Sequence, residues 1–411
     1  MSCLKGEGKM QNRPWETENW LTSEMNYWEE VRKDFTLPSK VLFHDATLRD
    51  GEQTPGVVFR KHEKVEIAKK LSELGVDRIE AGMPAVSEED AEAIKEIVAL
   101  KLPAKVLVFS RAMPKDLDNA LECGVWGVVL EVPSGEARIK YQMGWTEEQV
   151  IERSVTAVKY AKDNGLFVNF FPYDTTRAKF SFLERLLSEV MEKGGPDSVS
   201  VIDTTGVALP SAIGALVRKV KDLVKVPVEV HTHNDFGLGV AGTLSAVENG
   251  AEVVHVCANG LGERCGNSAL EEVAVCLKAL YGVETNIKYE KLYETAQLIQ
   301  ELSGVQLAQN KPVVGRVPFC REIGLGMNVV LEHPTVVFPI KPEFVGQKFQ
   351  MLLGKKSGKP SIQVKLDELG LSATEDQIAA MLKLVKSKGI EKKSTLTDDE
   401  FQVIADKVLK S

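Results

Sequence analysis

The sequence predicts an α/β protein built on a TIM (β/α)8 barrel, followed by a small α-rich C-terminal subdomain. Three observations support this prediction. Eight short apolar runs alternate with helical patterns from residue 39 to residue 285. Several of these helical patterns start on a Ser or Thr with an acid three residues later and stop at a Gly. Eight β-then-α units in about 245 residues are typical of this barrel, whereas the rival doubly wound sheet needs an early Gly-rich phosphate loop, which this chain lacks.

The expected strands are the short apolar runs, at residues 39–45, 76–82, 105–111, 127–133, 166–172, 197–203, 226–233 and 253–260. The helical patterns between them include residues 62–75, 87–100, 146–165, 181–194, 210–223 and 269–282. Strands that alternate with helices in this way form a parallel sheet.

Two flanking segments depart from this rhythm. Residues 1–38 are polar but carry Trp15, Trp20, Tyr27 and Trp28, so we expect an aromatic N-terminal arm that docks on the body or on a neighbouring subunit. Residues 39–285 form the barrel. Residues 286–411 are expected to form a linker and a helical C-terminal subdomain, whose helical patterns lie at 286–303, 359–370, 375–389 and 397–410.

Composition is that of an ordinary soluble globular protein, with 44% hydrophobic and 27% charged residues and a net charge of −8. Without a long basic run, nucleic acid and anionic membranes are poor partners. No apolar run reaches the roughly 18 residues of a transmembrane helix, and no signal-peptide pattern opens the chain. The six cysteines lack CxxC spacing, which fits a reducing cytoplasm and argues against a structural zinc site.

The seventh expected strand ends in His231-Thr232-His233. Side chains alternate along a strand, so the two imidazoles point to the same face and can share one divalent metal. The alternative is a pair of strand-end histidines satisfied by neighbouring backbone. This motif alone leaves both interpretations open.

Other polar residues are expected at the same rim of the barrel. Functional groups of this fold lie at the carboxyl ends of the strands, and in a closed barrel strand 1 neighbours strand 8. Asp50, which follows strand 1, and Asn267, which follows strand 8, therefore converge on His231 and His233. One carboxylate, two imidazoles and an amide oxygen suit Mg²⁺, Mn²⁺ or Zn²⁺ and leave about two octahedral positions open.

Open positions imply a substrate with two oxygen donors, such as a 2-oxo acid, whose carbonyl the metal would polarise as a Lewis acid. Arg49, beside Asp50, is placed to pair with the substrate or to stabilise a developing oxyanion. The alternative for Arg49 and Asp50 is a surface ion pair in a turn.

Four segments, HDATLRDGEQTPG, VHTHNDFGLGVAGTLSAVENGA, NGLGERCGNSALEEV and LGKKSG, resemble the isopropylmalate, homocitrate and citramalate synthase family. That family belongs to the DRE-TIM metallolyases, which include hydroxymethylglutaryl-CoA lyase. The similarity runs from about residue 39 to the end of the chain, with order and spacing kept. It implies Asp50, His231 and His233 as metal ligands with Asn267 nearby or ligating, and Arg49 as the oxyanion partner.

The resemblance also implies Gln53, Arg111 and Thr204 as contacts in a 2-oxo acid pocket. The alternative interpretation of Thr204 is a core residue of a strand, and that of Arg111 is a solvated charge at a strand end. In these synthases acetyl-CoA is deprotonated at its methyl group and attacks the keto group, and thioester hydrolysis follows. We therefore expect an acyltransferase that uses an acyl-CoA and a 2-oxo acid, works as a homodimer and resembles these synthases without their leucine-sensing regulatory domain.

The usual acid and base residues of the family are replaced. Tyr173 stands where the synthases carry a Glu after strand 5, and Gly326 where they carry a His; a subdomain Tyr is replaced near Val337. Tyr173, with a normal pKa near 10, would serve better as an acid than as a base. Asp174 and Glu131 are the candidate replacement bases, although Glu131 has a structural ion pair as its alternative.

Cys265 supports a rival function. Hydroxymethylglutaryl-CoA lyase keeps a catalytic Cys in its corresponding Gly-rich loop, so a metal-dependent retro-Claisen or retro-aldol lyase is the alternative to the synthase. The other interpretation of Cys265 is a small apolar filler. A third hypothesis, a binding protein that has lost turnover, is disfavoured because Arg49 and all four expected ligands are present.

Overall fold

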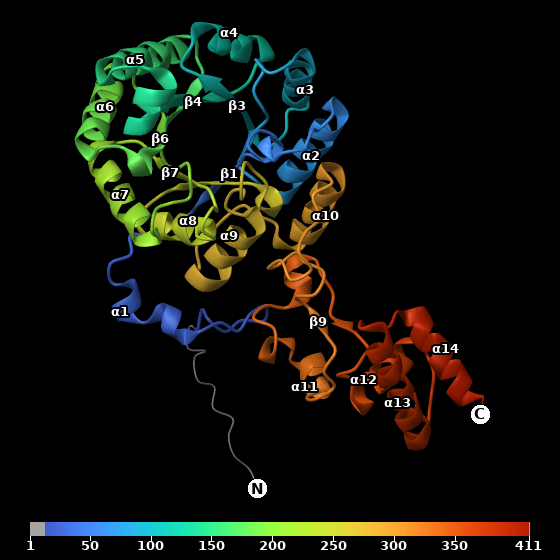
Figure 1. Ribbon diagram of the computed structural model, residues 1–411. Coiled ribbons are helices and arrows are strands. Elements are labelled where there is room, and N and C mark those ends of the chain that lie inside the picture. The colour runs from blue at the N-terminus through green and yellow to red at the C-terminus, as the bar shows by residue number, and fades with distance from the viewer. Residues whose placement is uncertain (1–12, 411) are drawn as a thin grey trace. The chain divides into compact units, whose positions relative to one another are not determined.

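The computed structural model describes residues 13–410 (Figure 1). Contacts between Cα atoms divide this part of the chain into two compact units. The first unit is Glu24–Leu307, and the second joins residues 13–23 to residues 308–410. Helix α10 (Leu292–Ser303) therefore lies in the first unit, where it packs on α2 (Lys61–Leu74).

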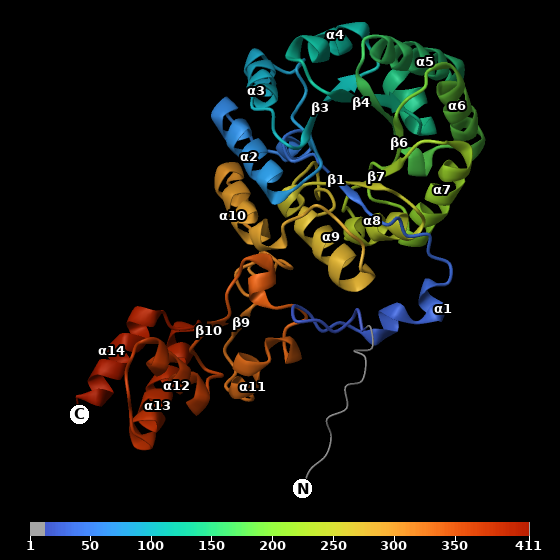
Figure 2. The same ribbon diagram turned by 180° about the vertical axis from the view of Figure 1, so that it is seen from behind.

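The first unit is a closed barrel of eight parallel strands, which confirms the predicted fold (Figures 1 and 2). Each strand pairs with the next, and β8 closes the ring on β1. The strands are β1 (Leu42–Asp45), β2 (Arg78–Glu80), β3 (Lys105–Arg111), β4 (Gly127–Pro133), β5 (Phe167–Tyr173), β6 (Ser198–Asp203), β7 (Val228–Thr232) and β8 (Val253–Val256).

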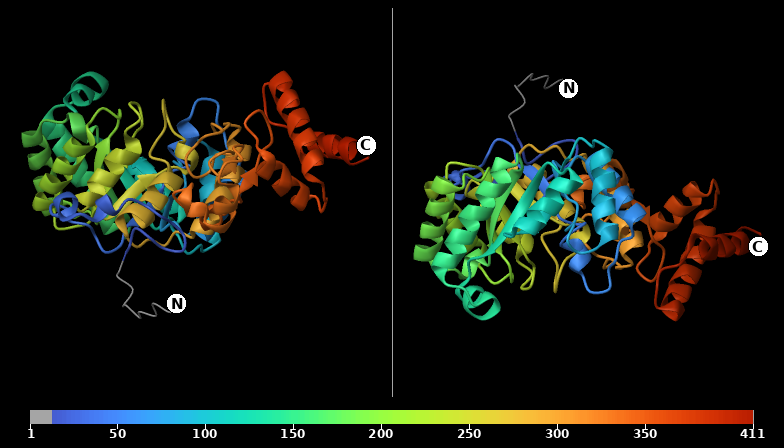
Figure 3. Two further views of the ribbon diagram at one scale, coloured as in Figure 1. Left: turned by 90° about the horizontal axis from the view of Figure 1, so that it is seen from below. Right: turned by 90° about the horizontal axis from the view of Figure 1, so that it is seen from above.

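Helices surround the strands and run alongside them, as the edge-on views show (Figure 3). Their ends follow the capping chemistry in the sequence. Thr146 caps α5 in a capping box with Gln149, and Ser87 accepts a hydrogen bond from Asp90 N at the start of α3. Besides α2, the helices of the barrel are α3 (Glu88–Ala99), α4 (Pro114–Cys123), α5 (Glu147–Asp163), α6 (Phe180–Lys193), α7 (Pro210–Leu223), α8 (Gly239–Glu248) and α9 (Leu270–Cys276).

The interior of the barrel has an apolar half and a polar half. The apolar half comes from β3 to β6 and consists of Leu107, Phe109, Val129, Phe171, Tyr173 and Ile202. The polar half comes from β7, β8, β1 and β2 and holds buried His44, Arg78, Glu80, Glu229, His231 and His255. A functional site built on charge therefore lies against the β7-to-β2 side of the barrel.

A buried ion network fills the polar half below the strand ends. Arg78 Nη1 lies 2.6 Å from Glu229 Oε1. Strands β1 and β8 separate β2 from β7 in the ring, so these two side chains can meet only because both point into the barrel. Glu229 Oε2 lies 2.7 Å from His255 Nε2. The His255 ring stacks on His44 with the centroids 4.1 Å apart. Each charge in this network has a partner, as burial requires.

The described part of the arm makes contacts within each of the two units. Within the first unit, Arg32 Nη2 donates to Leu280 O at 2.9 Å. Within the second unit, the ring of Trp20 meets Phe344 edge-on at 5.5 Å. None of the helices formed by residues 13–410 is both long and apolar enough to cross a membrane.

The second unit has a helical core. Buried Ile362, Met381, Val385 and Phe401 bring together its three longest helices, α12 (Lys359–Glu368), α13 (Glu375–Lys392) and α14 (Asp398–Leu409). The segment before them, expected to be a linker, contains α11 (Met327–Glu332) and the short paired strands β9 (Cys320–Arg321) and β10 (Gln350–Met351). The α-rich character of this region is as predicted.

Candidate active site

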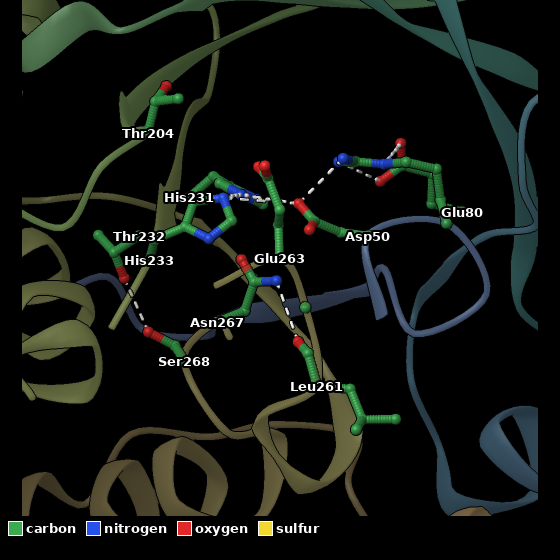
Figure 4. Close-up of polar contacts among 12 residues, drawn as sticks. Asp50, Glu80, Thr204, His231, Thr232, His233, Leu261, Glu263, Asn267 and Ser268 are labelled. Carbon is green, nitrogen blue, oxygen red and sulfur yellow. Dashed lines mark hydrogen bonds and ion pairs between the residues drawn. The ribbon is translucent and has the colours of Figure 1, made fainter. Parts of the chain in front are cut away.

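Three ligand-type atoms converge at the rim between β7 and β1 (Figure 4). Asp50 Oδ2 lies 3.3 Å from His231 Nε2 and 3.7 Å from His233 Nε2. The two Nε2 atoms are 3.3 Å apart. The i, i+2 spacing on β7 thus places both rings on one face, and the residue after β1 supplies the carboxylate, as expected.

These residues fit a divalent metal. Neighbouring ligands around one small ion, each bound at about 2.1 Å, lie about 3 Å apart, which is close to the spacing of the three atoms. All three side chains are buried, and Asp50 Oδ1 has no hydrogen-bond partner among the described residues. A cation between the three atoms would satisfy the buried carboxylate and both imidazole lone pairs at once.

The electrostatics of the three residues suit metal binding. Burial lowers the pKa of both imidazoles, that of His233 to about 4, so both rings are neutral at neutral pH and keep a lone pair. Burial alone would raise the pKa of Asp50, but the Arg49 guanidinium and the two histidines hold it well below its usual range. The set is therefore two neutral nitrogen donors and one carboxylate.

Arg49 is held in place by two carboxylates. Its Nη1 donates to Asp50 Oδ2 at 2.9 Å, while Nε and Nη2 donate to the two oxygens of Glu80 at 2.7 and 3.2 Å. Its guanidinium carbon also lies 4.3 Å from the centroid of the Phe109 ring. Arg49 is only 8% exposed, so it is a fixed charge beside the metal ligands and not a surface ion pair in a turn.

The loop after β8 delivers Asn267 to the same rim. Asn267 forms a β-bridge with His233, its Nδ2 donates to Leu261 O at 3.1 Å, and its buried Oδ1 has no partner among residues 13–410. Arg264 fastens the loop by donating to both oxygens of Asp235, at 2.8 and 3.1 Å. The free amide oxygen of Asn267 is thus available beside the two imidazoles.

Gly266 sets the path of this loop, because its φ is +80° and a Cβ there would lie 1.9 Å from Gly260 O. We expect Gly266→Ala to displace Asn267 and to weaken Mn²⁺ binding by about 10- to 100-fold, the range for residues that orient metal ligands. Calorimetric titration of both proteins with Mn²⁺ measures this. Gly144→Ala is the matched control, since Gly144 has a φ of +65° in open space; equal Mn²⁺ affinities of the two variants would contradict the role of Gly266.

A pocket of about 370 Å³ opens above these residues. Of the residues expected in the site, it is lined by Arg49, Asp50, Gln53, Arg111, Glu131, Tyr173, Thr204, His231 and His233. Arg111 reaches it with its guanidinium already bound to Asp116, at 2.7 and 3.0 Å. Thr204 uses its Oγ1 to accept a hydrogen bond from Asp174 N at 2.8 Å.

The structure separates the candidate acid and base residues, Glu131, Tyr173 and Asp174, and the candidate catalytic Cys265. Glu131 and Tyr173 line the pocket, whereas the lining does not include Asp174 or Cys265. Asp174 is buried and accepts from Arg177 Nε at 2.7 Å, and Cys265 is exposed to solvent. Burial raises the pKa of Glu131 to about 7 and, with Glu131 nearby, that of Tyr173 to about 12.

A second group of metal-ligand types, His44, Glu229 and His255, lies deeper in the barrel. It does not suit an ion. Glu229 is already paired with Arg78 and His255, and the two imidazole planes are stacked within 7° of parallel. Lone pairs that lie in parallel planes 4.1 Å apart cannot converge on one ion. We assign this group to the ion network.

Sequence reasoning missed two carboxylates of the site. Glu80 lies in the expected strand at residues 76–82, next to Ile79, and it anchors Arg49. Glu263 comes from the loop after β8 and lines the same pocket as Asp50 and His231. In the sequence, Glu263 and Arg264 are two adjacent charged residues, a pattern that is also typical of a solvated loop.

This chain forms a closed (β/α)8 barrel, and two histidines and a carboxylate converge at the carboxyl ends of its strands. These features place it in the class of barrel proteins with a candidate metal centre. Residues 40–299 match the HMGL-like family, and residues 313–393 match the homocitrate synthase post-HMGL domain-like family. The chain belongs to the HMGL-like family, within its DRE-TIM synthase group. The predicted family resemblance is confirmed.

Individual relatives are similar over most of their length. Homocitrate synthase AksA of Methanopyrus kandleri is 42% identical over 94% of this chain and 96% of its own. 2-Isopropylmalate synthase of Methanocaldococcus jannaschii is 42% identical over 93% of this chain and 74% of its own. (R)-Citramalate synthase CimA of the same organism is 45% identical over 85% of this chain and 71% of its own.

Among solved structures, the HMG-CoA lyase of Bacillus subtilis superposes with a TM-score of 0.61 at 22% identity. The match covers 67% of this chain and 97% of that protein. At this identity the likeness concerns the barrel fold alone.

Proposed function

We propose that this protein is a divalent-metal-dependent acyltransferase that condenses an acyl-CoA, acetyl-CoA in the simplest case, with a 2-oxo acid. Water then releases CoA and leaves a 2-hydroxy diacid. The observation that carries the proposal is the buried Asp50, His231 and His233 set beside an Arg49 fixed by Glu80. The synthase names of the relatives support it.

Each part of the site has a role in this reaction. A divalent ion held by Asp50, His231 and His233 would act as a Lewis acid on the 2-oxo group. Arg49 is fixed by its bonds to Asp50 and Glu80, so its remaining N–H groups can stabilise the negative charge that develops on the former keto oxygen. The absence of thiolates from the set suits Mg²⁺, Mn²⁺ or Zn²⁺.

The acyl methyl group needs a base, and Glu263 is the carboxylate best placed for it. A thioester enters from solvent, and Glu263 lies at the solvent side of the pocket with its side chain 57% exposed. It lines the same pocket as Asp50, His231 and His233, beside which the bond would form. Glu131, in contrast, lies on the wall formed by the apolar half of the barrel.

Tyr173 is the acid in this scheme. A phenol whose pKa is raised to about 12 by burial holds its proton at neutral pH and can donate it. We expect Tyr173→Phe to lower kcat by about 100-fold, within the range for general acid catalysis, with little change in KM. Steady-state kinetics measures this; a KM effect alone would make Tyr173 a binding residue instead.

One assay tests the proposed function. Purified protein with Mn²⁺ and a panel of 2-oxo acids should release free CoA from acetyl-CoA only when a 2-oxo acid is present. If no acid supports release, but a 3-hydroxyacyl-CoA or a 2-hydroxy diacid is cleaved, the lyase alternative replaces the synthase. The exposed position of Cys265, outside the pocket lining, favours the synthase.

A homodimer and a cytoplasmic location stay predictions. The second unit exposes apolar side chains around α11, such as Leu325, Leu331 and Val336. Such side chains are typical of a surface that a second copy covers. Light scattering of the purified protein measures the mass in solution, and a monomer at micromolar concentration would contradict the dimer.

A further inference from the structure

Glu131 occupies an unusual place in the pocket. It is a charged residue in the middle of β4, where it pairs in register with Arg111 on β3 and Phe171 on β5. Its inward neighbours on the same side of the barrel are the apolar residues Phe109, Phe171 and Ile202. A carboxylate in such surroundings is costly unless something pairs with it.

No protein group pairs with it. The three cations that act on it have other partners: Arg49 is bound to Asp50 and Glu80, Arg111 to Asp116, and Arg138 Nε lies 4.0 Å from Asp174 Oδ2. Within the part of the chain that the structure describes, Glu131 makes no hydrogen bond and no ion pair. Its carboxylate is thus left facing the space that a ligand fills.

The position of β4 in the ring says which part of a ligand reaches Glu131. The metal ligands come from β7 and from the residue after β1, and two strands separate β4 from each of these. Glu131 therefore lies on the wall opposite the metal ligands. A 2-oxo acid whose keto and carboxylate end faces Asp50, His231 and His233 extends its side chain toward that wall.

We propose that Glu131 selects 2-oxo acids whose side chain ends in a hydrogen-bond donor, a hydroxyl or a cationic N–H group, and rejects those that end in a carboxylate. The inference rests on the proposed function, because it places the 2-oxo acid at the metal ligands. A donor supplies the partner that Glu131 lacks. A terminal carboxylate would instead bring a second negative charge to this wall of the pocket.

The test is direct binding of three 2-oxo acids of equal length to Mn²⁺-loaded protein, measured by calorimetry. They are 5-hydroxy-2-oxopentanoate, 2-oxopentanoate and 2-oxoglutarate, which end in a hydroxyl, a methyl and a carboxylate. The wild type should bind the hydroxy acid roughly 10- to 100-fold more tightly than the methyl acid, the range for a hydrogen bond to a charged group. It should bind 2-oxoglutarate most weakly.

Two variants of Glu131 separate charge from hydrogen bonding. Glu131→Gln should improve the binding of 2-oxoglutarate by about tenfold, because the like charge is gone. Glu131→Leu should remove the preference for the hydroxyl over the methyl. Glu263→Gln is the matched control with the same loss of charge in the same pocket; it should lower kcat for every acid and leave the order of binding unchanged.

Other outcomes overturn the inference. If the wild type binds 2-oxoglutarate as tightly as the hydroxy acid, or if both Glu131 variants keep the wild-type order, Glu131 does not select the substrate. If Glu131→Gln lowers kcat equally for all acids at unchanged affinity, Glu131 is the base. If the acids bind in the predicted order but no CoA is released, the condensation is contradicted and the selection by Glu131 stands. If CoA is released but the acids do not bind in that order, the selection is contradicted and the condensation stands.

Discussion

Replacing His233 with Ala is expected to abolish metal binding and turnover together. His233 supplies one of three convergent ligand atoms, and its Nε2 lies 3.3 Å from that of His231. The remaining two ligands hold an ion weakly, so Mn²⁺ affinity should fall by about 100-fold or more. The accompanying loss in kcat/KM should reach about 1,000-fold, which corresponds to about 4 kcal/mol.

Calorimetry with Mn²⁺ and an assay of CoA release measure the two effects. His62→Ala is the control, because His62 lies exposed on α2, away from the pocket lining. It should bind metal and turn over as the wild type does. Full activity in His233→Ala would refute the metal site itself.

The second large effect concerns stability. Glu229→Gln removes the charge that pairs with Arg78 and His255, and leaves the guanidinium buried at 7% exposure without its carboxylate. Breaking a buried ion pair in this way costs about 3–5 kcal/mol of the free energy of unfolding. Urea titration followed by circular dichroism measures it.

The pH dependence of this effect has a definite sign. Burial alone would raise the pKa of Glu229, but Arg78 and His255 lower it below the usual value of 4.5. The contribution of Glu229 to stability is therefore fully present above about pH 4.5 and is lost as the pH falls toward the lowered pKa. Glu229→Gln should lack this acid-dependent loss.

The double variant Arg78→Met, Glu229→Leu is the control for Glu229→Gln. It removes both charges and fills the space with apolar groups, so most of the stability should return. If Glu229→Gln alone were as stable as the wild type, the network would not stabilise the barrel. A double variant that stays as unstable as Glu229→Gln would assign the loss to packing and not to charge.

The fold could be predicted from the sequence because strand and helix signals agree with each other at every step. All eight expected strands are present, and caps such as Thr146 mark helix starts where the sequence places them. The convergence of Asp50, His231 and His233 could be predicted too, since it follows from strand periodicity and from the closure of β8 on β1.

The rest of the site depends on side-chain directions that no local pattern contains. Glu80 and Glu131 are both acids within expected strands, yet Glu80 binds Arg49 and Glu131 faces the pocket unpaired. The difference comes from their neighbours in the ring, because β2 is next to β1 and its Arg49 loop whereas β4 lies on the opposite wall. Asp174, next to Tyr173 in sequence, is likewise held outside the lining by Arg177.

The division of the barrel interior explains how one site can be kept while its chemistry changes. The polar half carries the metal ligands, Arg49 and the ion network, in which each charged group is fixed by another. The apolar half carries Tyr173, which stands where the family has a Glu, and Glu131, which is an unpaired carboxylate among apolar side chains. We therefore expect substitutions in the second half to alter what the pocket accepts and to leave Asp50, His231 and His233 untouched.

The most direct test of the central claim is anomalous diffraction from crystals of the protein soaked with Mn²⁺ and a 2-oxo acid. The predicted result is one strong peak between Asp50, His231 and His233, with density for the 2-oxo acid beside it and its side chain directed toward Glu131. A peak at His44, Glu229 and His255, or a 2-oxo acid bound away from the first three residues, would contradict the account.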